Sequence, residues 1–424
     1  MAEIRPFGAL RFTEKAGDLA SCLCPPYDII PEAQRVALAE QNPNNVIRLE
    51  LPRGEEPYAA AAATLSDWLS RGILAEDEQE GLYVYEEEFT VRGETKKIRG
   101  LVCTVKLEEF SKGVVLPHEE TLSKAKQDRF NLMCACGCNF SQIYSMYMDE
   151  EKVIKTELDK IAAGKPENDL VTSDGITQRL WICNDEATIA NIVKAFSDKQ
   201  LYIADGHHRY ETAINYRNHL HENGIATEAD AKANYVMMFL IDIDDEGLVI
   251  FPTHRVLFDL ENFDLDAVLT KVSEYFTVED REGCESIEAE LEKYADKPSF
   301  ALYVGGENYK LLRLKDASVL DTLIPDRSAA YRALDVTALH SLILEVCFGI
   351  DRENMANQKN LIYTRDAKEA LDLVRDGRAT CSFILNSTKI HQIRDVAAAS
   401  DKMPQKSTYF YPKLITGLTM NKLL

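Results

Sequence analysis

The sequence predicts an α+β protein in which helices flank a mixed sheet, and it predicts more than one domain. Residues 81–110 alternate apolar and polar side chains with the period of two that is typical of half-buried strands. Between about 142 and 224, strand-like and helix-like segments follow one another, which favours a partly parallel sheet. The length of 424 residues exceeds one ordinary core, so two or three domains are expected.

The N-terminal elements follow from local patterns. Residues 32–40 and 58–69 predict helices, whereas 42–51, NPNNVIRLEL, predicts a turn leading into a strand. The dipeptide Arg92-Gly93 marks a hairpin turn within the alternating segment. Residues 122–135 predict a further helix.

The central elements alternate between strands and helices. Strands are expected at 142–148, 179–185 and 201–205, and a helix is expected after each of the last two. Two apolar runs, 234–243 and 248–257, predict strands joined across DDEG. Amphipathic helices and a β unit come next, followed by a buried helix in DVTALHSLILEVCFGI. We therefore expect an N-terminal mixed α/β region over 1–258 and a C-terminal α/β region over 259–424.

The composition argues against several classes of function. The net charge of −22 repels polyanions and no basic stripe offsets it, so DNA binding is not expected. No run of eighteen apolar residues and no signal-like N-terminus occur, so neither membrane insertion nor secretion is expected. Ten scattered cysteines fit a reducing compartment, and a cytoplasmic protein is predicted. The oligomeric state stays open.

The segment LYIADGHHRYETA predicts a strand, a tight turn and a helix. The first N–H groups of a helix lack partners within it and its dipole makes that end positive, so the turn after Ala204 is a candidate anion site. Gly206 lets a ligand approach the backbone, Arg209 can pair with phosphate oxygens, and His207 and His208 can donate hydrogen bonds or move protons.

Two alternatives compete with this interpretation. Asp205 can simply cap the helix while the histidines fill polar crevices. A zinc site is disfavoured, because adjacent histidines on one helix do not face the same metal.

The segment PHEETLSKAKQDR places His118 and Glu119 before a helix, where either can serve as a base for a hydroxyl nucleophile. The alternative is a solvated helix start with capping acids. Farther on, Lys406, Ser407 and Thr408 follow one another in MPQKSTYFYPK, which suggests a phosphate contact or a plain turn. No glycine-rich P-loop pattern precedes them.

Two shorter motifs add candidates. PTHRV puts His254 and Arg255 at a strand end, as phosphate ligands or as an exposed terminus. PPYDII stiffens the backbone around Tyr27 and Asp28, which are candidate substrate contacts, although Asp28 can equally cap a helix. The cluster Cys134, Cys136 and Cys138 lacks the usual spacing of zinc ligands, so packed thiols are expected there.

Several motifs together carry a resemblance to known proteins. IADGHHRYETA resembles the helix-opening motif of the ParB and sulfiredoxin superfamily, in which free-serine kinases carry DGHHR. Over its full length the chain resembles a prokaryotic family known as domain of unknown function 1015. The matching segments are RPFGALR, PPYDII, NPNNVIRL, PHEETLSKAKQDR, DGHHRYETA, PTHRV and MPQKSTYFYPK.

The resemblance implies a ParB/sulfiredoxin-like core with an additional α/β domain. It implies a kinase-type phosphotransferase that acts on a small hydroxylated metabolite, free L-serine or phosphoserine, with ATP, ADP or pyrophosphate as donor. Mg²⁺ is the expected cofactor and Asp205 its expected ligand. The alternative is a nucleotide-binding regulatory or switch protein without turnover.

Overall fold

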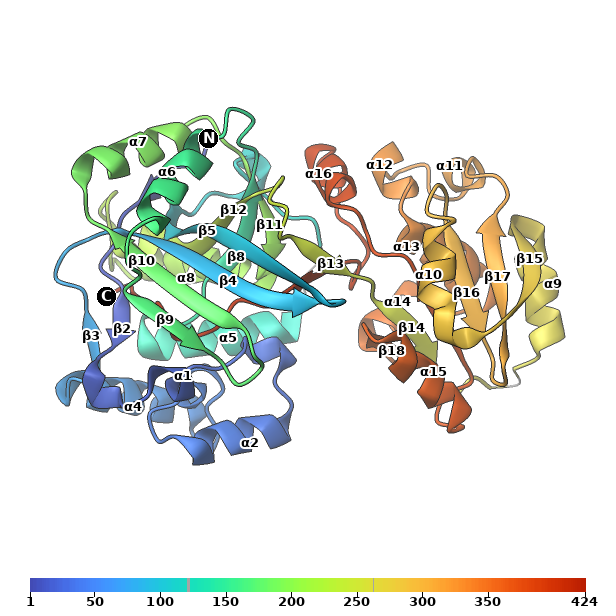
Figure 1. Cartoon of the computed structure of the whole chain (residues 1–424), viewed down its shortest axis with the longest axis horizontal. Coiled ribbons are helices and arrows are strands. Elements are labelled where there is room, and N and C mark those ends of the chain that lie inside the picture. The colour runs from blue at the N-terminus through green and yellow to red at the C-terminus, as the bar shows by residue number, and fades with distance from the viewer. Residues whose placement is uncertain (120–122, 262) are drawn as a thin grey trace. The chain divides into compact units, whose positions relative to one another are not determined.

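The structure, a computed structural model, describes residues 1–119, 123–261 and 263–424. Figure 1 shows the chain, which divides into two compact units. Of the described residues, unit 1 comprises Met1–Pro117, 123–248 and Pro412–Leu424, and unit 2 comprises 118–119 and Val249–Tyr411.

Unit 1 is built around a mixed sheet. Among its described residues, nine strands form this sheet in the order β6-β11-β8-β12-β5-β4-β10-β9, with β1 paired to β5. The pairs β11–β6 and β12–β8 are parallel, and the other pairs are antiparallel. The strands of unit 1 are β1 Ile4–Arg5, β2 Leu10–Phe12, β3 Leu74–Glu76, β4 Leu82–Val91, β5 Glu94–Lys106, β6 Val115–Leu116, β7 Cys138–Asn139, β8 Ile143–Tyr147, β9 Asn168–Val171, β10 Thr177–Cys183, β11 Leu201–Asp205, β12 Tyr235–Asp242 and β21 Asn421–Lys422.

Helices complete unit 1. An apolar core joins the sheet to α6, α7 and α8, and Figure 1 shows α6 and α7 side by side. The helices are α1 Leu19–Cys22, α2 Glu32–Gln41, α3 Ile47–Glu50, α4 Pro57–Ser70, α5 Ser123–Cys136, α6 Val153–Ala162, α7 Glu186–Phe196 and α8 His207–Glu222. The predicted α+β class with a mixed, partly parallel sheet is confirmed.

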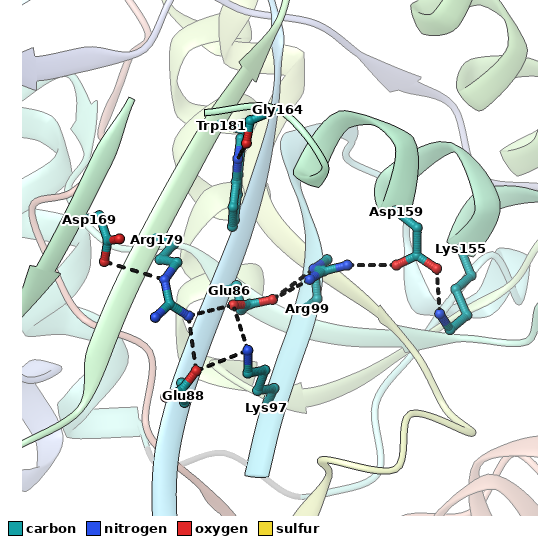
Figure 2. Close-up of polar contacts among 10 residues, drawn as sticks. All are labelled: Glu86, Glu88, Lys97, Arg99, Lys155, Asp159, Gly164, Asp169, Arg179 and Trp181. Carbon is teal, nitrogen blue, oxygen red and sulfur yellow. Dashed lines mark hydrogen bonds and ion pairs between the residues drawn. The ribbon is translucent and has the colours of Figure 1, made fainter. Parts of the chain in front are cut away.

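A buried carboxylate ties three strands of unit 1 together. Glu86 on β4 accepts from Arg99 Nε on β5 at 2.9 Å and from Arg179 Nη1 on β10 at 2.8 Å. Figure 2 shows these contacts, and it shows Arg99 extending to Asp159 on α6. The Glu86 side chain is 3% exposed, so these cations compensate a charge that is almost removed from water.

Unit 2 contains a six-stranded antiparallel sheet within its described residues, in the order β15-β17-β16-β19-β14-β18. Its strands are β13 Val249–Phe251, β14 His254–Leu257, β15 Phe276–Glu282, β16 Ser299–Tyr303, β17 Asn308–Leu314, β18 Leu361–Thr364, β19 Cys381–Leu385 and β20 Tyr409–Tyr411. Its helices are α9 Leu265–Tyr275, α10 Ile287–Glu292, α11 Val319–Leu323, α12 Ala329–Arg332, α13 Asp335–Ala338, α14 Arg352–Asn357, α15 Ala367–Arg375 and α16 Ile390–Ala398, together with a π-helix over Leu339–Cys347.

The unit boundary differs from the predicted division after residue 258. β13 and β14 precede that point but belong to unit 2, because β13 pairs with β20 and β14 pairs with β18 and β19. Residues 412–424 return to unit 1, where β21 pairs with β7.

The other local predictions had mixed outcomes. The hairpin is confirmed, with positive φ at Arg92 and Gly93 between β4 and β5. The predicted strand in 42–51 is wrong, because α3 forms there. Asn45, which is itself buried, explains this turn of helix: its side chain accepts from the Ile47 N–H and donates to the carbonyls of Ser21 and Leu23. The predicted start of α5, at residue 122, lies outside the described residues.

Candidate functional site

The turn after Ala204 has the predicted strand–glycine–helix geometry. β11 is buried through Ala204, and Gly206 is the N-cap of α8 with φ 95°. Glycine adopts this left-handed conformation without strain. A Cβ at position 206 would also lie 2.9 Å from Nε of Arg209, so the side chain of Arg209 occupies the space that glycine leaves. The turn is therefore shaped for this glycine and this arginine together.

Asp205, the last residue of β11, lies between two cations. Its Oδ2 accepts from Arg209 Nη2 at 2.8 Å, and its Oδ1 accepts from Lys413 Nζ. Burial alone would raise the pKa of this carboxyl, but the charges of Lys413 and Arg209 outweigh burial and lower it. Asp205 is therefore an ionised carboxylate that holds both cations in place.

Arg209 turns inward from α8. Its Nη1 donates to the Gln142 carbonyl at 2.6 Å, and its buried Nε has no hydrogen-bond partner among the described residues. Arg209 also lines a cavity of about 40 Å³. Thr212, one turn farther along α8, lines the same cavity with a buried hydroxyl that has no described partner. This space is large enough for two or three water molecules.

Arg129 lines the cavity together with Arg209 and connects it to the N-terminal motifs. Its Nη1 donates to the Glu50 carbonyl at 2.8 Å, and its guanidinium lies 4.2 Å from the ring centroid of Tyr27. Burial raises the pKa of Tyr27 far above its usual value, so the ring stays neutral. The predicted contact Tyr27 thus lies in the same unit as the DGHHR turn and next to its cavity.

The remaining residues of unit 1 lie as follows. His207 is buried and His208 is half-buried, both in the first turn of α8. Asp28 is exposed and makes no hydrogen bond or ion pair with a described residue, so the structure does not bring it to the cluster. Sequence reasoning missed Lys413 and Gln142. The only signal for Lys413 was its place at the end of the MPQKSTYFYPK motif.

The other predicted residues meet in unit 2. His118 is 1% exposed, and its Nε2 lies 3.0 Å from Oγ1 of Thr408. Oε1 of Glu119 accepts from the Lys406 N–H at 2.6 Å. Glu119 therefore fixes the backbone of the Lys-Ser-Thr loop, where Lys406 is exposed and has φ 57°. Ser407 is buried and donates to the carbonyl of Pro404.

His254 and Arg255 lie in the interior of unit 2, not at an exposed strand end. Arg255 is 1% exposed and donates to the carbonyls of Thr253 and Lys406 and to Nε2 of His340. His254 is fully buried, and burial with the nearby Arg255 charge lowers its pKa to about 4. Through Lys406, Arg255 joins the group formed by His118, Glu119 and the loop.

The donor set around Asp205 does not fit a metal site. Both carboxylate oxygens accept from cations, and the charges of Lys413 and Arg209 would repel a metal ion bound beside them. In the described ranges, no group of three or more His, Cys, Asp or Glu side chains is placed to hold a metal ion. Mg²⁺ as a cofactor stays a prediction, but these contacts argue against Asp205 as its ligand, and no step below depends on a metal ion. The packed thiols predicted for the cysteine cluster are confirmed at Cys138, which is buried, but the prediction is wrong for Cys134, which is exposed; burial raises the pKa of both thiols.

The fold and this site define an α+β protein in which a strand of the larger sheet ends at a glycine turn. At this turn the carboxylate of Asp205 holds two cations, Lys413 and Arg209. The chain belongs to the family described as Protein of unknown function (DUF1015), whose model matches residues 4–337. The family predicted from the motifs is thus confirmed. No curated protein matches the chain. No helix of the described residues is long and apolar enough to cross a bilayer, and the cytoplasmic location stays a prediction.

Several solved structures show distant similarity. A free serine kinase in complex with AMP is 13% identical, with a TM-score of 0.36 over 73% of this chain and 88% of that one. A conserved hypothetical protein from Pyrococcus furiosus is 14% identical, with a TM-score of 0.34 over 70% and 87%. C-terminally truncated SbnI from Staphylococcus aureus is 11% identical, with a TM-score of 0.37 over 75% and 86%.

Proposed function

We propose that the chain is a kinase-type phosphotransferase that acts on a small hydroxylated metabolite, with ATP, ADP or pyrophosphate as phosphate donor. The single observation that carries this proposal is the Asp205 carboxylate, which holds Lys413 and Arg209 at the start of α8. Free L-serine is the proposed acceptor, because the DGHHR motif resembles that of free-serine kinases.

The arrangement suits phosphate chemistry. A phosphoryl group in transfer carries charge on its oxygens, and catalysis depends mainly on positioned cations and hydrogen-bond donors. Here the cations do not need to be ordered when a ligand binds, since Asp205 already orders them. The N-terminus of α8 adds backbone donors and the positive end of a dipole.

The roles of the individual residues follow from their places. Gly206 allows close approach to the backbone, and His207 and His208 supply imidazole donors in the first turn of α8. His118 and Glu119 remain the proposed bases for the acceptor hydroxyl. Lys406, Ser407 and Thr408, with His254 and Arg255, remain proposed phosphate contacts in unit 2, and Tyr27 and Asp28 remain proposed substrate contacts in unit 1. Mg²⁺ is proposed to arrive with the phosphate donor.

One observation favours a second candidate, a nucleotide-binding regulatory protein without turnover. Asp205 has both oxygens engaged by cations and is a poor base, and the bases proposed above, His118 and Glu119, already contact the Lys406 loop. Such a protein would bind a nucleotide at the same turn and release it unchanged.

The test is to incubate the purified chain with L-serine, Mg²⁺ and, separately, ATP, ADP or pyrophosphate, and to measure phosphoserine. We expect product with at least one donor, and we expect Asp205→Asn and His207→Ala to lose it. Asp198→Asn is the matched control, because Asp198 is 76% exposed and its nearest cation is the neighbouring Lys199. Nucleotide binding without product would favour the regulatory protein, and neither binding nor product would exclude both candidates.

A further inference from the structure

Unit 2 contains a cavity of about 120 Å³ that none of the roles above uses. It is far larger than the 10 to 15 Å³ that one water molecule needs and well below the roughly 300 Å³ of a pocket for a drug-sized ligand. The space therefore suits one compact ligand and is too small for a whole nucleotide. The residues that line it and matter here are Arg327, His340, Ser341, Arg352, Tyr363 and Lys402.

Positive charge is in excess around this cavity. Within the part of the chain that the structure describes, three cations line it, Arg327, Arg352 and Lys402, against one lining carboxylate, Glu345. Glu345 lies 3.3 Å from Nε of Arg352. Outside the lining, Asp401 pairs with Arg327 at 2.8 Å.

One layer behind the wall lies a further cation, Arg255. It contacts two lining residues, because it donates from Nε to His340 at 3.2 Å and lies 5.3 Å from the ring centroid of Tyr363. Among the described residues, Arg255 has no carboxylate partner within ion-pair distance, although it is 1% exposed. Glu119 acts on Arg255 only through its charge, without an ion pair, and an anion in the neighbouring cavity would reduce the cost of burying this cation.

The hydrogen bond from Arg255 fixes the proton of His340. A guanidinium only donates, so Nε2 of His340 must accept and its proton must lie on Nδ1. Burial and the Arg255 charge lower the pKa of His340, so the ring is neutral. Its Nδ1–H makes no hydrogen bond to another described residue. A lining histidine thus has a donor available for a ligand.

Two hydroxyls add further donors. The buried hydroxyl of Tyr363 has no hydrogen-bond partner in the described part of the chain. The Ser341 hydroxyl likewise makes no hydrogen bond to a described residue. Ser341 and His340 lie on the π-helix Leu339–Cys347. π-helical turns are rare in proteins, and many of those that occur lie at functional sites.

We propose that this cavity is a second anion site, which binds a single phosphate group as inorganic phosphate or as the phosphate of a small monoester. Guanidinium groups would neutralise the charge, and the imidazole N–H and the two hydroxyls would each donate to one oxygen. Met403, Pro404 and Gln405 also line the cavity and directly precede the Lys406 loop, so a bound phosphate would contact the stem of that loop.

The experiment titrates the full chain with inorganic phosphate and with O-phosphoserine by calorimetry, in buffers free of other oxyanions. We expect saturable binding of one or both, and no comparable heat from chloride or acetate. Tyr363→Phe should weaken binding about three- to tenfold, since it removes one donor to a charged ligand. Its melting temperature should stay unchanged, because the hydroxyl makes no hydrogen bond to a described residue. Arg352→Met should weaken binding about tenfold or more.

Two control variants separate this site from the proposed phosphotransferase site. Arg394→Met also removes one arginine charge from unit 2, but Arg394 is 42% exposed and pairs with its neighbour Asp395, so phosphate binding should not change. Asp205→Asn alters unit 1 only, and it should leave the Tyr363-dependent binding intact. The proposal would be overturned by the absence of phosphate binding, by equal affinity in wild type, Tyr363→Phe and Arg352→Met, or by loss of all binding in Asp205→Asn. None of these results depends on phosphoserine formation.

Discussion

Nζ of Lys413 donates a hydrogen bond to Oδ1 of Asp205, although 208 positions separate the two residues in the chain. The lysine side chain is 9% exposed and the aspartate side chain 18% exposed, so the pair is largely shielded from water. The chain leaves unit 1 after residue 248 and forms most of unit 2 before it returns with this lysine. The central ion pair of the candidate site therefore depends on the last segment of unit 1.

Lys413→Met should destabilise unit 1. Removing one partner of a buried ion pair leaves a charge incompletely compensated, which costs about 3 to 5 kcal/mol, and Arg209 keeps the loss near the lower figure. Thermal unfolding of the wild type and of Lys413→Met measures this loss of stability. The control Lys160→Met changes a lysine that is 64% exposed, so its effect should stay within about 0.5 kcal/mol.

The same variant makes a pH prediction. The folded-state pKa of Asp205 is lowered, so its pairing stabilises the protein above the ordinary pKa of 3.8, and this contribution is lost as the pH falls through the folded pKa. The stability gap between wild type and Lys413→Met should therefore be constant at neutral pH and narrow in acid below 3.8. A gap that widens in acid would contradict the assignment of Lys413 as the partner of Asp205.

Gly206→Ala should affect stability and the Arg209 contact together. Backbone strain at φ 95° costs about 1 to 3 kcal/mol, and the new Cβ would displace Arg209 from Asp205. Gly224→Ala, just beyond the other end of α8, is a matched control with φ 70° and no atom within 4 Å of the new Cβ. We expect Gly206→Ala to be the more destabilising of the two in thermal melts. If the two variants lost the same amount of stability, the side chain of Arg209 would move away from the new Cβ without an energetic cost.

Glu87 on β4 should make stability fall as the pH rises. It is fully buried, and burial raises its pKa from 4.5 to about 8, while Tyr85 donates to its Oε1 at 2.7 Å. The folded state thus binds one more proton than the unfolded state between these two values, so this contribution decreases with pH across that window. Glu87→Gln should flatten the decline in melting temperature between about pH 5 and pH 8. A parallel decline in both proteins would rule out Glu87 as its source.

The buried carboxylate of Glu86 should contribute more to the free energy of unfolding than the more exposed carboxylate of Glu88. Glu86→Gln removes the carboxylate that Arg99 and Arg179 share, but both arginines are partly exposed and keep other carboxylate partners, so a loss of about 1.5 to 3 kcal/mol is expected. Glu88→Gln is the comparison, because Glu88 is 27% exposed and contacts Lys97 and Arg179 near the surface, where about 1 kcal/mol is expected. Urea unfolding measures both, and similar midpoints for the two variants would show that the network of Figure 2 is solvated in solution.

Local chemistry made much of the fold predictable. The strand, turn and helix around Gly206 follow from an apolar run, a glycine and helical spacing, all within about twenty residues. In residues 46–51 the local preference is overridden. Their branched side chains favour a strand, but the Asn45 side chain accepts from the Ile47 N–H and stabilises a helical turn. That contact involves carbonyls of Ser21 and Leu23, which no local pattern reveals.

The candidate site was predicted only in part for the same reason. The DGHHR residues could be predicted from their types and their order in the sequence. Lys413 could not, because it is a single lysine after an aromatic strand. Nor does the sequence indicate that His118, Glu119 and the Lys406 loop gather in unit 2, whereas Asp205 belongs to unit 1. Residue types identify candidate chemistry, but the long-range pairing of strands decides which candidates meet.

Residues 412–424 of unit 1 are translated after unit 2, so unit 1 is completed last during synthesis. While the ribosome is still translating unit 2, the nascent unit 1 already contains Asp205 and Arg209 but not the lysine that completes their cluster. Because domains generally fold as they emerge, N-terminal parts first, the larger sheet can assemble early with this position unfilled. The ion-pair cluster at the turn after Ala204 is then completed only after residue 413 has been translated, when the whole of unit 2 has been made.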